Sequence, residues 1–314
     1  VTLTELTCSN TQHGWYCTGQ VYSRIKQLEI TLIAMNTLVL TTIIVCLAQT
    51  HAQNYCSLCR NHTMCLYPGT GPACSRRMYW GVKNETKQEI VDIHNRYRQK
   101  VANGQEKRGA PGPQPAAADM SKLVIGYELA TIAQRWADQC TFQHDLCRRV
   151  DRFGWVGQNL YMSGRWQSNG VHPQANQNWE EAIAAFYNEV AYLNNKNIDS
   201  FSSYPPKNGK EVGHYTQLVW GATYRVGCGY SAFVDTKDGK DWFRQYYVCD
   251  YGPGGNVVGR RIYVPGKACS SCPRNSTCKD GLCEVSPSSF SSSRAPRTSR
   301  FPFWFNFPSR WFYI

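Results

Sequence analysis

Apolar residues in the middle of the chain recur at the spacing of an α-helix. The first stretch follows a capping-box pair, Thr86 and Glu89, and should end before Gly104. Glycine and proline dominate the loop that comes next, at residues 109–115. Three helices are predicted on this pattern: one over 90–101, one near 127–140 and one near 178–193.

The period of the pattern changes after residue 210. Short runs rich in β-branched and aromatic residues are then separated by glycine or polar turns. The predicted strands are 215–220, 225–233 and 243–251, with 257–264 as a further candidate. Helices followed by strands predict an α+β fold, with helices packed on an antiparallel sheet. Residues 54–80 have few apolar positions and are expected to be irregular.

An uncharged apolar run, residues 38–48, is followed by a small residue, Ala52. This pattern predicts a signal peptide over 35–52, cleaved after Ala52. The alternative is a signal anchor over 30–48, with Arg24 and Lys26 holding its N-terminal side in the cytoplasm. Cleavage is favoured because the threonines and asparagine in the run suit a membrane span poorly. Residues 1–34 are then expected to be upstream sequence without a function.

The cysteines agree with secretion. The chain has 15, of which three precede residue 53 and twelve follow it. Twelve is an even number, as six disulfides require, and disulfides belong to oxidising compartments. A protein released into the extracellular space is therefore expected, with no transmembrane segment after cleavage. The twelve are Cys56, Cys59, Cys65, Cys74, Cys140, Cys147, Cys228, Cys249, Cys269, Cys272, Cys278 and Cys283.

The net charge is +12, but the basic residues are scattered and form no run longer than two. Such a surface is typical of a solvated protein, and no nucleic-acid partner is expected. Three N-x-S/T tripeptides are candidate glycosylation sites. They lie at Asn61, Asn84 and Asn275.

Common catalytic patterns are absent from the sequence: it has no H-E-x-x-H and no G-x-S-x-G. Residues 252–259 are glycine-rich but lack the lysine of a phosphate loop, so they are read as a turn. Four cysteines between 269 and 283 are expected to form disulfides of open connectivity rather than a zinc site. The tail, 286–314, is expected to be disordered or an artefact, with a membrane-seeking peptide as the alternative. From spacing alone, no histidine is identified as a ligand.

Four stretches carry a resemblance to a known family. They are GHYTQLVW with VGCG (213–220 and 226–229), YVCDYGPGGN (247–256), HNR (94–96) and GQNL (157–160). Together they resemble the signatures of the CAP superfamily of cysteine-rich secretory, antigen 5 and pathogenesis-related-1 proteins. Residues 54–265 are similar to the antigen 5 proteins, or venom allergens 5, of arthropod venom and saliva.

The resemblance implies a three-layer α-β-α sandwich with a central, mainly antiparallel sheet. The CAP domain would span 81–265, after a cysteine-rich N-terminal segment at 53–80. A small disulfide-rich module at 266–285 is similar to the hinge of cysteine-rich secretory proteins. By the same resemblance, the first eight cysteines of the set pair as Cys56–Cys65, Cys59–Cys147, Cys74–Cys140 and Cys228–Cys249.

The resemblance also implies a cleft with two histidines and two acidic positions. The histidines are His144 and His214, and one acid is Glu189; the other position holds Gln158. Neutral imidazoles suit zinc or another divalent cation, with Glu189 and Gln158 in support. Glutamine lacks the charge of glutamate, so Gln158→Glu is expected to strengthen metal binding.

The expected function is that of a secreted venom or salivary protein that acts by binding and requires no cofactor. Its ligand would be a sterol, a fatty acid, a divalent metal ion or a host protein. No residue is assigned a catalytic role. One alternative is a metal-dependent hydrolase that uses His144, His214 and Glu189. Another is a toxin or allergen that acts through its surface alone.

Overall fold

The computed structural model describes residues 8–12, 14–17, 27, 30–35, 54–166, 176–202 and 209–285. The predicted signal peptide, apart from Met35, and the predicted tail lie outside these residues. The chain divides into two units, Val1–Asn54 and Tyr55–Ile314. In the first unit, strands β1 (Cys8–Thr11) and β2 (Gly14–Cys17) pair antiparallel. Among the described residues, no helix is long and apolar enough to cross a membrane.

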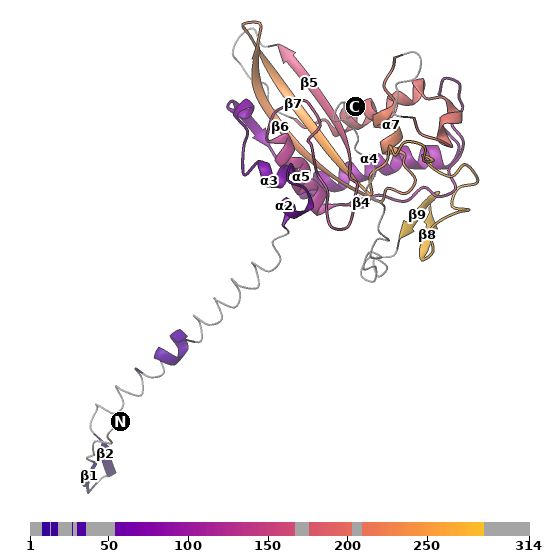
Figure 1. Cartoon of the computed structure of the whole chain (residues 1–314). Helices are drawn as coiled ribbons and strands as arrows, with labels where there is room; N and C mark the ends of the chain where they lie inside the picture. Colours follow the sequence, from indigo (N-terminus) through magenta and orange to yellow (C-terminus); the bar gives the residue numbers. More distant parts are fainter. Residues whose placement is uncertain are drawn as a thin grey trace. The chain divides into compact units, whose positions relative to one another are not determined.

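A mainly antiparallel sheet forms the centre of the second unit (Figure 1). Its strands follow the order β3-β6-β7-β5, and the short β4 pairs in parallel with β6. The strands β6 and β7 join through Asp238 and Gly239, whose φ angles of 54° and 70° suit a two-residue hairpin turn. The bounds are β3 Arg77–Trp80, β4 Val124–Ile125, β5 Gly157–Trp166, β6 Arg225–Lys237 and β7 Lys240–Gly252.

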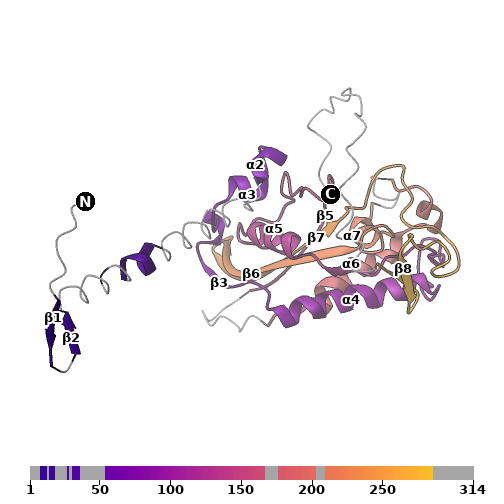
Figure 2. The ribbon, with the colours of Figure 1, turned by 90° about the horizontal axis from the view of Figure 1, so that it is seen from below.

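Helices cover both faces of this sheet, which gives the three layers that were predicted (Figure 2). On one face, α5 packs Ala133 and Trp136 against Tyr246 and Val248 of β7. On the other face, α4, α6 and α7 bury their apolar side chains in the main core. The helix bounds are α4 Asn84–Ala102, α5 Tyr127–Ala137, α6 Trp179–Asn188 and α7 Gly213–Leu218, with 3₁₀ turns η2 Glu189–Tyr192 and η3 Asn195–Ile198.

Two glycines of β6 allow α5 to lie directly on the sheet. A Cβ atom at Gly227 would come within 2.2 Å of the Ala130 nitrogen, and one at Gly229 within 2.4 Å of the Gln134 backbone. No larger residue fits at either position, since backbone atoms of a packed helix cannot move aside. The glycines that flank Cys228 in the family signature therefore have a packing role.

The three predicted helices are present, but other expectations were wrong. Residues 215–220 were predicted to be a strand, and 213–218 form α7 instead. Residues 257–264 form no strand, and β5 was not predicted. The capping-box pair also does not begin α4, because the helix starts at Asn84, ahead of Thr86.

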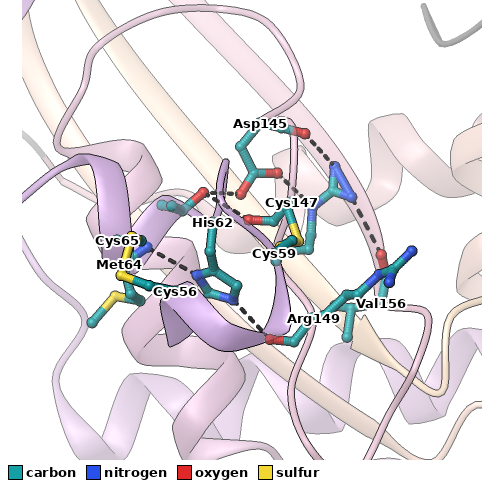
Figure 3. Close-up of a disulfide and its surroundings, with 11 residues drawn as sticks. Cys56, Cys59, His62, Met64, Cys65, Asp145, Cys147, Arg149 and Val156 are labelled. Carbon is teal, nitrogen blue, oxygen red and sulfur yellow. Dashed lines mark hydrogen bonds and ion pairs between the residues drawn. A yellow bond between two sulfur atoms is a disulfide. The ribbon is translucent and has the colours of Figure 1, made fainter. Parts of the chain in front are cut away.

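The N-terminal cysteine-rich segment is more regular than expected. It holds α2 (Tyr55–Leu58), α3 (Thr63–Leu66) and the turn η1 (Pro72–Cys74), and it ends in β3, which pairs with β6. Two disulfides, Cys59–Cys147 (Figure 3) and Cys74–Cys140, tie it to the region that follows α5. Cys56–Cys65 closes a loop within the segment, and Cys228–Cys249 links β6 to β7.

The C-terminal module is a small hairpin, β8 (Ser276–Lys279) and β9 (Leu282–Val285), with bridges Cys269–Cys278 and Cys272–Cys283. Backbone hydrogen bonds and a buried side chain join it to the rest of the second unit. Cys283 exchanges backbone hydrogen bonds with Met120 (2.8 Å) and Lys122 (2.9 Å). Leu282 is 1% exposed and belongs to the main core. The module therefore packs against the main core and is not connected to it by a flexible linker alone.

Candidate functional site

His144 lies in the segment between α5 and β5, and its ring is oriented by Gln158 at the start of β5. The ring Nδ1 is 2.7 Å from Oε1 of Gln158. An amide oxygen can only accept, so Nδ1 carries the proton. Burial, followed by the nearby cation of Arg148, lowers the pKa of His144 to about 4, and His214 contributes to the same shift. His144 is therefore neutral at physiological pH.

His214 is the second residue of α7, and Glu189 at the start of η2 orients its ring. The ring Nδ1 is 2.6 Å from Oε1 of Glu189. Oε2 of the same carboxylate accepts the backbone N–H groups of His214 (2.9 Å) and Tyr215 (3.2 Å). Phe186 stacks on the imidazole with 5.2 Å between ring centroids. The ring is thus held on one edge and on one face.

Strand β5 contacts both histidines. Gln158 binds the ring of His144, and the next residue, Asn159, donates to the carbonyl of His214 (3.0 Å). In the part of the chain that the structure describes, neither Nε2 atom has a hydrogen-bond partner. A metal-binding histidine has this arrangement, with one nitrogen bonded to an acceptor and the other free. Gln158 and Glu189 therefore orient the rings, and each Nε2 atom is left available to a ligand.

A buried charged cluster beneath His144 was missed by the sequence analysis. Arg148 Nε donates to Asp145 Oδ1 (2.6 Å), and its Nη2 donates to Gln158 Oε1 (3.1 Å). The nitrogen of Gln158 donates to Asp145 Oδ1 (3.2 Å) and Asp250 Oδ1 (3.0 Å). Burial and the charge of Asp145 raise the pKa of Asp250 well above its ordinary value. The sequence held one signal, since Asp145 directly follows His144, but none that placed Asp250 beside it.

The other two described histidines have structural roles, as expected for histidines outside a site. His94 is fully buried and bonds Ile90 O (2.7 Å) and Tyr251 OH (2.9 Å). His62 bonds the carbonyl of Arg149 (2.7 Å), and its other ring nitrogen accepts a backbone N–H (Figure 3). Both nitrogens of each ring are used.

The cysteines of the C-terminal module do not form a metal site. The sulfur atoms of Cys269, Cys272 and Cys283 lie within 4.8 Å of one another. All three are oxidised in disulfides, so they offer no thiolate for a cation. The three N-x-S/T asparagines, Asn61, Asn84 and Asn275, are exposed, as attachment of a glycan requires.

The sequence matches the model of the cysteine-rich secretory protein family, CAP, over residues 91–251. Venom allergen 3 of Solenopsis invicta is 46% identical over 225 residues, which cover 69% of this chain and 92% of that protein. Venom allergen 5.01 of Dolichovespula maculata is 40% identical over 234 residues, 72% of this chain and 95% of that one.

Solved structures agree with the fold. BmVAL-1 superimposes with a TM-score of 0.52 at 29% identity, covering 65% of this chain and 96% of its own. Na-ASP-1 gives 0.51 at 30% identity, covering 69% and 50%. The stretch matched by the family model contains both site histidines and their partners. The chain therefore belongs to the CAP family of cysteine-rich secretory proteins, among relatives that are venom allergens of the antigen 5 type.

Proposed function

We propose that this protein acts by binding, and that a divalent cation such as zinc is held between Nε2 of His144 and Nε2 of His214. The observation that carries the proposal is the orientation of the two rings. Each turns its Nδ1 to an oxygen acceptor, at 2.7 and 2.6 Å, and so leaves Nε2 to a ligand. Neutral imidazole is a preferred ligand of zinc, and the Glu189 carboxylate adds negative charge behind one ring.

Secretion is part of the same proposal. Six disulfides among the described residues suit an oxidising compartment. The similar proteins from Solenopsis and Dolichovespula are venom allergens. The sterol, fatty-acid and host-protein ligands that the resemblance implies stay predictions.

The bonds of Glu189 support binding without turnover. A metal-dependent hydrolase would need this carboxylate as the base that takes a proton from water. Its oxygens already accept three hydrogen bonds, from the His214 ring and from two backbone N–H groups. Proton transfer to Glu189 would disrupt the contact that orients His214. We expect no zinc-dependent hydrolysis of peptide or ester substrates above the rate of a His214→Ala control.

The test is a zinc titration by calorimetry. The wild-type protein should bind zinc at one site, and the His144→Ala, His214→Ala double variant should lose that binding. His62→Gln, at an imidazole whose two nitrogens already bond Arg149 O and Met64 N, serves as the matched control and should bind like the wild type. Equal affinity of wild type and double variant would refute the site, provided circular dichroism shows that both are folded.

A further inference from the structure

The side-chain amide of Gln158 has a bonding partner at every position. Its two N–H groups face carboxylate oxygens, Asp145 Oδ1 at 3.2 Å and Asp250 Oδ1 at 3.0 Å. Its oxygen accepts from His144 Nδ1 at 2.7 Å and from Arg148 Nη2 at 3.1 Å. Rotation of the amide by 180° would place oxygen against two carboxylates and N–H groups against a guanidinium. The charges around it therefore permit one orientation of the amide.

Burial makes this preference strong. Gln158 is 9% exposed, Asp145 is 6% exposed and Asp250 is fully buried. Electrostatic interactions are stronger in such surroundings than in water, and unpaired polar groups cost more. Oδ2 of Asp250 already lacks a hydrogen-bond partner among the described residues. Losing the bond to Gln158 would leave the carboxylate with no hydrogen bond among the described residues and only the ion pair to Arg148 Nε, at 3.9 Å.

We propose that Asp145 and Asp250 are positioning residues, which fix the amide of Gln158 and through it the tautomer of His144. With the amide oxygen held toward the ring, Nδ1 of His144 must donate and Nε2 must carry the lone pair. A reversed amide would demand the opposite tautomer and would place a proton on Nε2, where a cation should bind. Only the effect on cation binding rests on the proposed function. The tautomer itself is a property of the metal-free protein.

Asp145 also links this device to the N-terminal cysteine-rich segment. Its Oδ2 accepts from the hydroxyl of Thr63. The backbone N–H of Thr63 donates to the carbonyl of Cys147 (2.9 Å), and Cys147 is bridged to Cys59 (Figure 3). The segment that contains α3 thus fixes the position of Asp145, one of the two carboxylates that orient the amide, through the hydroxyl of Thr63. The cysteine-rich segment is in this sense part of the histidine site.

The test reads the tautomer of His144 by NMR in protein labelled with ¹⁵N-histidine, at neutral pH and without metal. The wild type should show His144 with the proton on Nδ1. The Asp145→Asn, Asp250→Asn double variant, in which Arg148 also loses its anionic partners, should show a mixture of tautomers. Asp119→Asn is the matched control, because its carboxylate accepts from Val264 N (2.8 Å) away from the site. The control should retain the wild-type tautomer.

A second variant keeps the proposal testable if the double variant does not fold. Gln158→Met removes the acceptor for Nδ1 but preserves the size of the side chain. It should also give mixed tautomers, and its zinc affinity should fall about tenfold or more. A proton on Nε2 in the wild type, or unchanged tautomers in the folded variants, would overturn the inference. Failure of the wild type to bind zinc would refute only the proposed function, since the tautomer is read without metal.

Discussion

Position 158 shows how the neighbours of a side chain decide what it can do. A glutamate there was expected to strengthen metal binding through its charge. In the structure, it would face the carboxylates of Asp145 and Asp250, with the one cation of Arg148 between three acids. The uncharged amide avoids that repulsion and satisfies all four groups. The structure therefore argues against the expectation that Gln158→Glu would improve the site.

We expect Gln158→Glu to lower the free energy of unfolding at pH 7 by about 3 kcal/mol, because it adds an uncompensated charge to a buried cluster. Urea denaturation measures this. The control is Gln245→Glu in β7, whose oxygen accepts from the hydroxyls of Tyr230 (2.9 Å) and Tyr247 (3.3 Å). A carboxylate can accept both of these bonds, so the control should cost much less. Equal costs for the two variants would count against the repulsion argument.

The sequence predicted the members of the site better than their roles. His144, His214 and Glu189 were identified through the resemblance to antigen 5 proteins. Spacing could not bring them together, because they lie on separate elements that meet only in the folded chain. Asp250 was missed for a related reason. It follows a disulfide-bonded strand residue, and only the pairing of β5 with β7 places it opposite Gln158.

At the scale of elements, the long periodic helices were predictable and the short ones were not. α7 has six residues, of which five are buried, so its sequence shows no helical stripe of polar positions. The strand β5 was missed because its sequence, GQNLYMSGRW, contains two glycines and several polar residues. It is a strand because β7 pairs with it along its whole length. Tertiary contacts decided both cases.

The docking of the C-terminal module makes another prediction at this scale. Leu282→Ala should lower the free energy of unfolding by about 2–5 kcal/mol, because the side chain belongs to the main core. Unfolding should remain a single transition, followed by tryptophan fluorescence in urea. Val285→Ala, at a half-buried position on the same strand, is the control and should cost about 1 kcal/mol or less. If Leu282→Ala left the free energy of unfolding unchanged, the module would be an independent unit that does not contribute to the main core.

The stability of the whole molecule should depend on pH through buried histidine. Burial, aided by the cation of Arg98, lowers the pKa of His94 from the ordinary value of 6.5 to about 4. The unfolded chain binds this proton below pH 6.5, whereas the folded protein binds it only near pH 4. Stability from this group is therefore complete above pH 6.5 and decreases by about 3 kcal/mol as the pH falls toward 4.

Chemical denaturation at several pH values measures this dependence. His94→Gln should make the decline between pH 6.5 and 4 shallower by about the contribution of this one group, because His144, whose pKa is also about 4, keeps its own contribution. The variant starts from a lower stability at pH 7. The same slope in His94→Gln and the wild type would assign the acid sensitivity to other groups.

The bridges of the N-terminal half are nested, since Cys59–Cys147 encloses Cys74–Cys140. Any single backbone cut between residues 74 and 140 falls inside both loops. Lys107 is exposed in this stretch, so a protease of tryptic specificity can reach it. The two pieces would stay joined by two covalent links, and the nicked molecule would retain its size until a reductant released them. After a single cut by a protease in this region, the two fragments would therefore remain one disulfide-linked molecule.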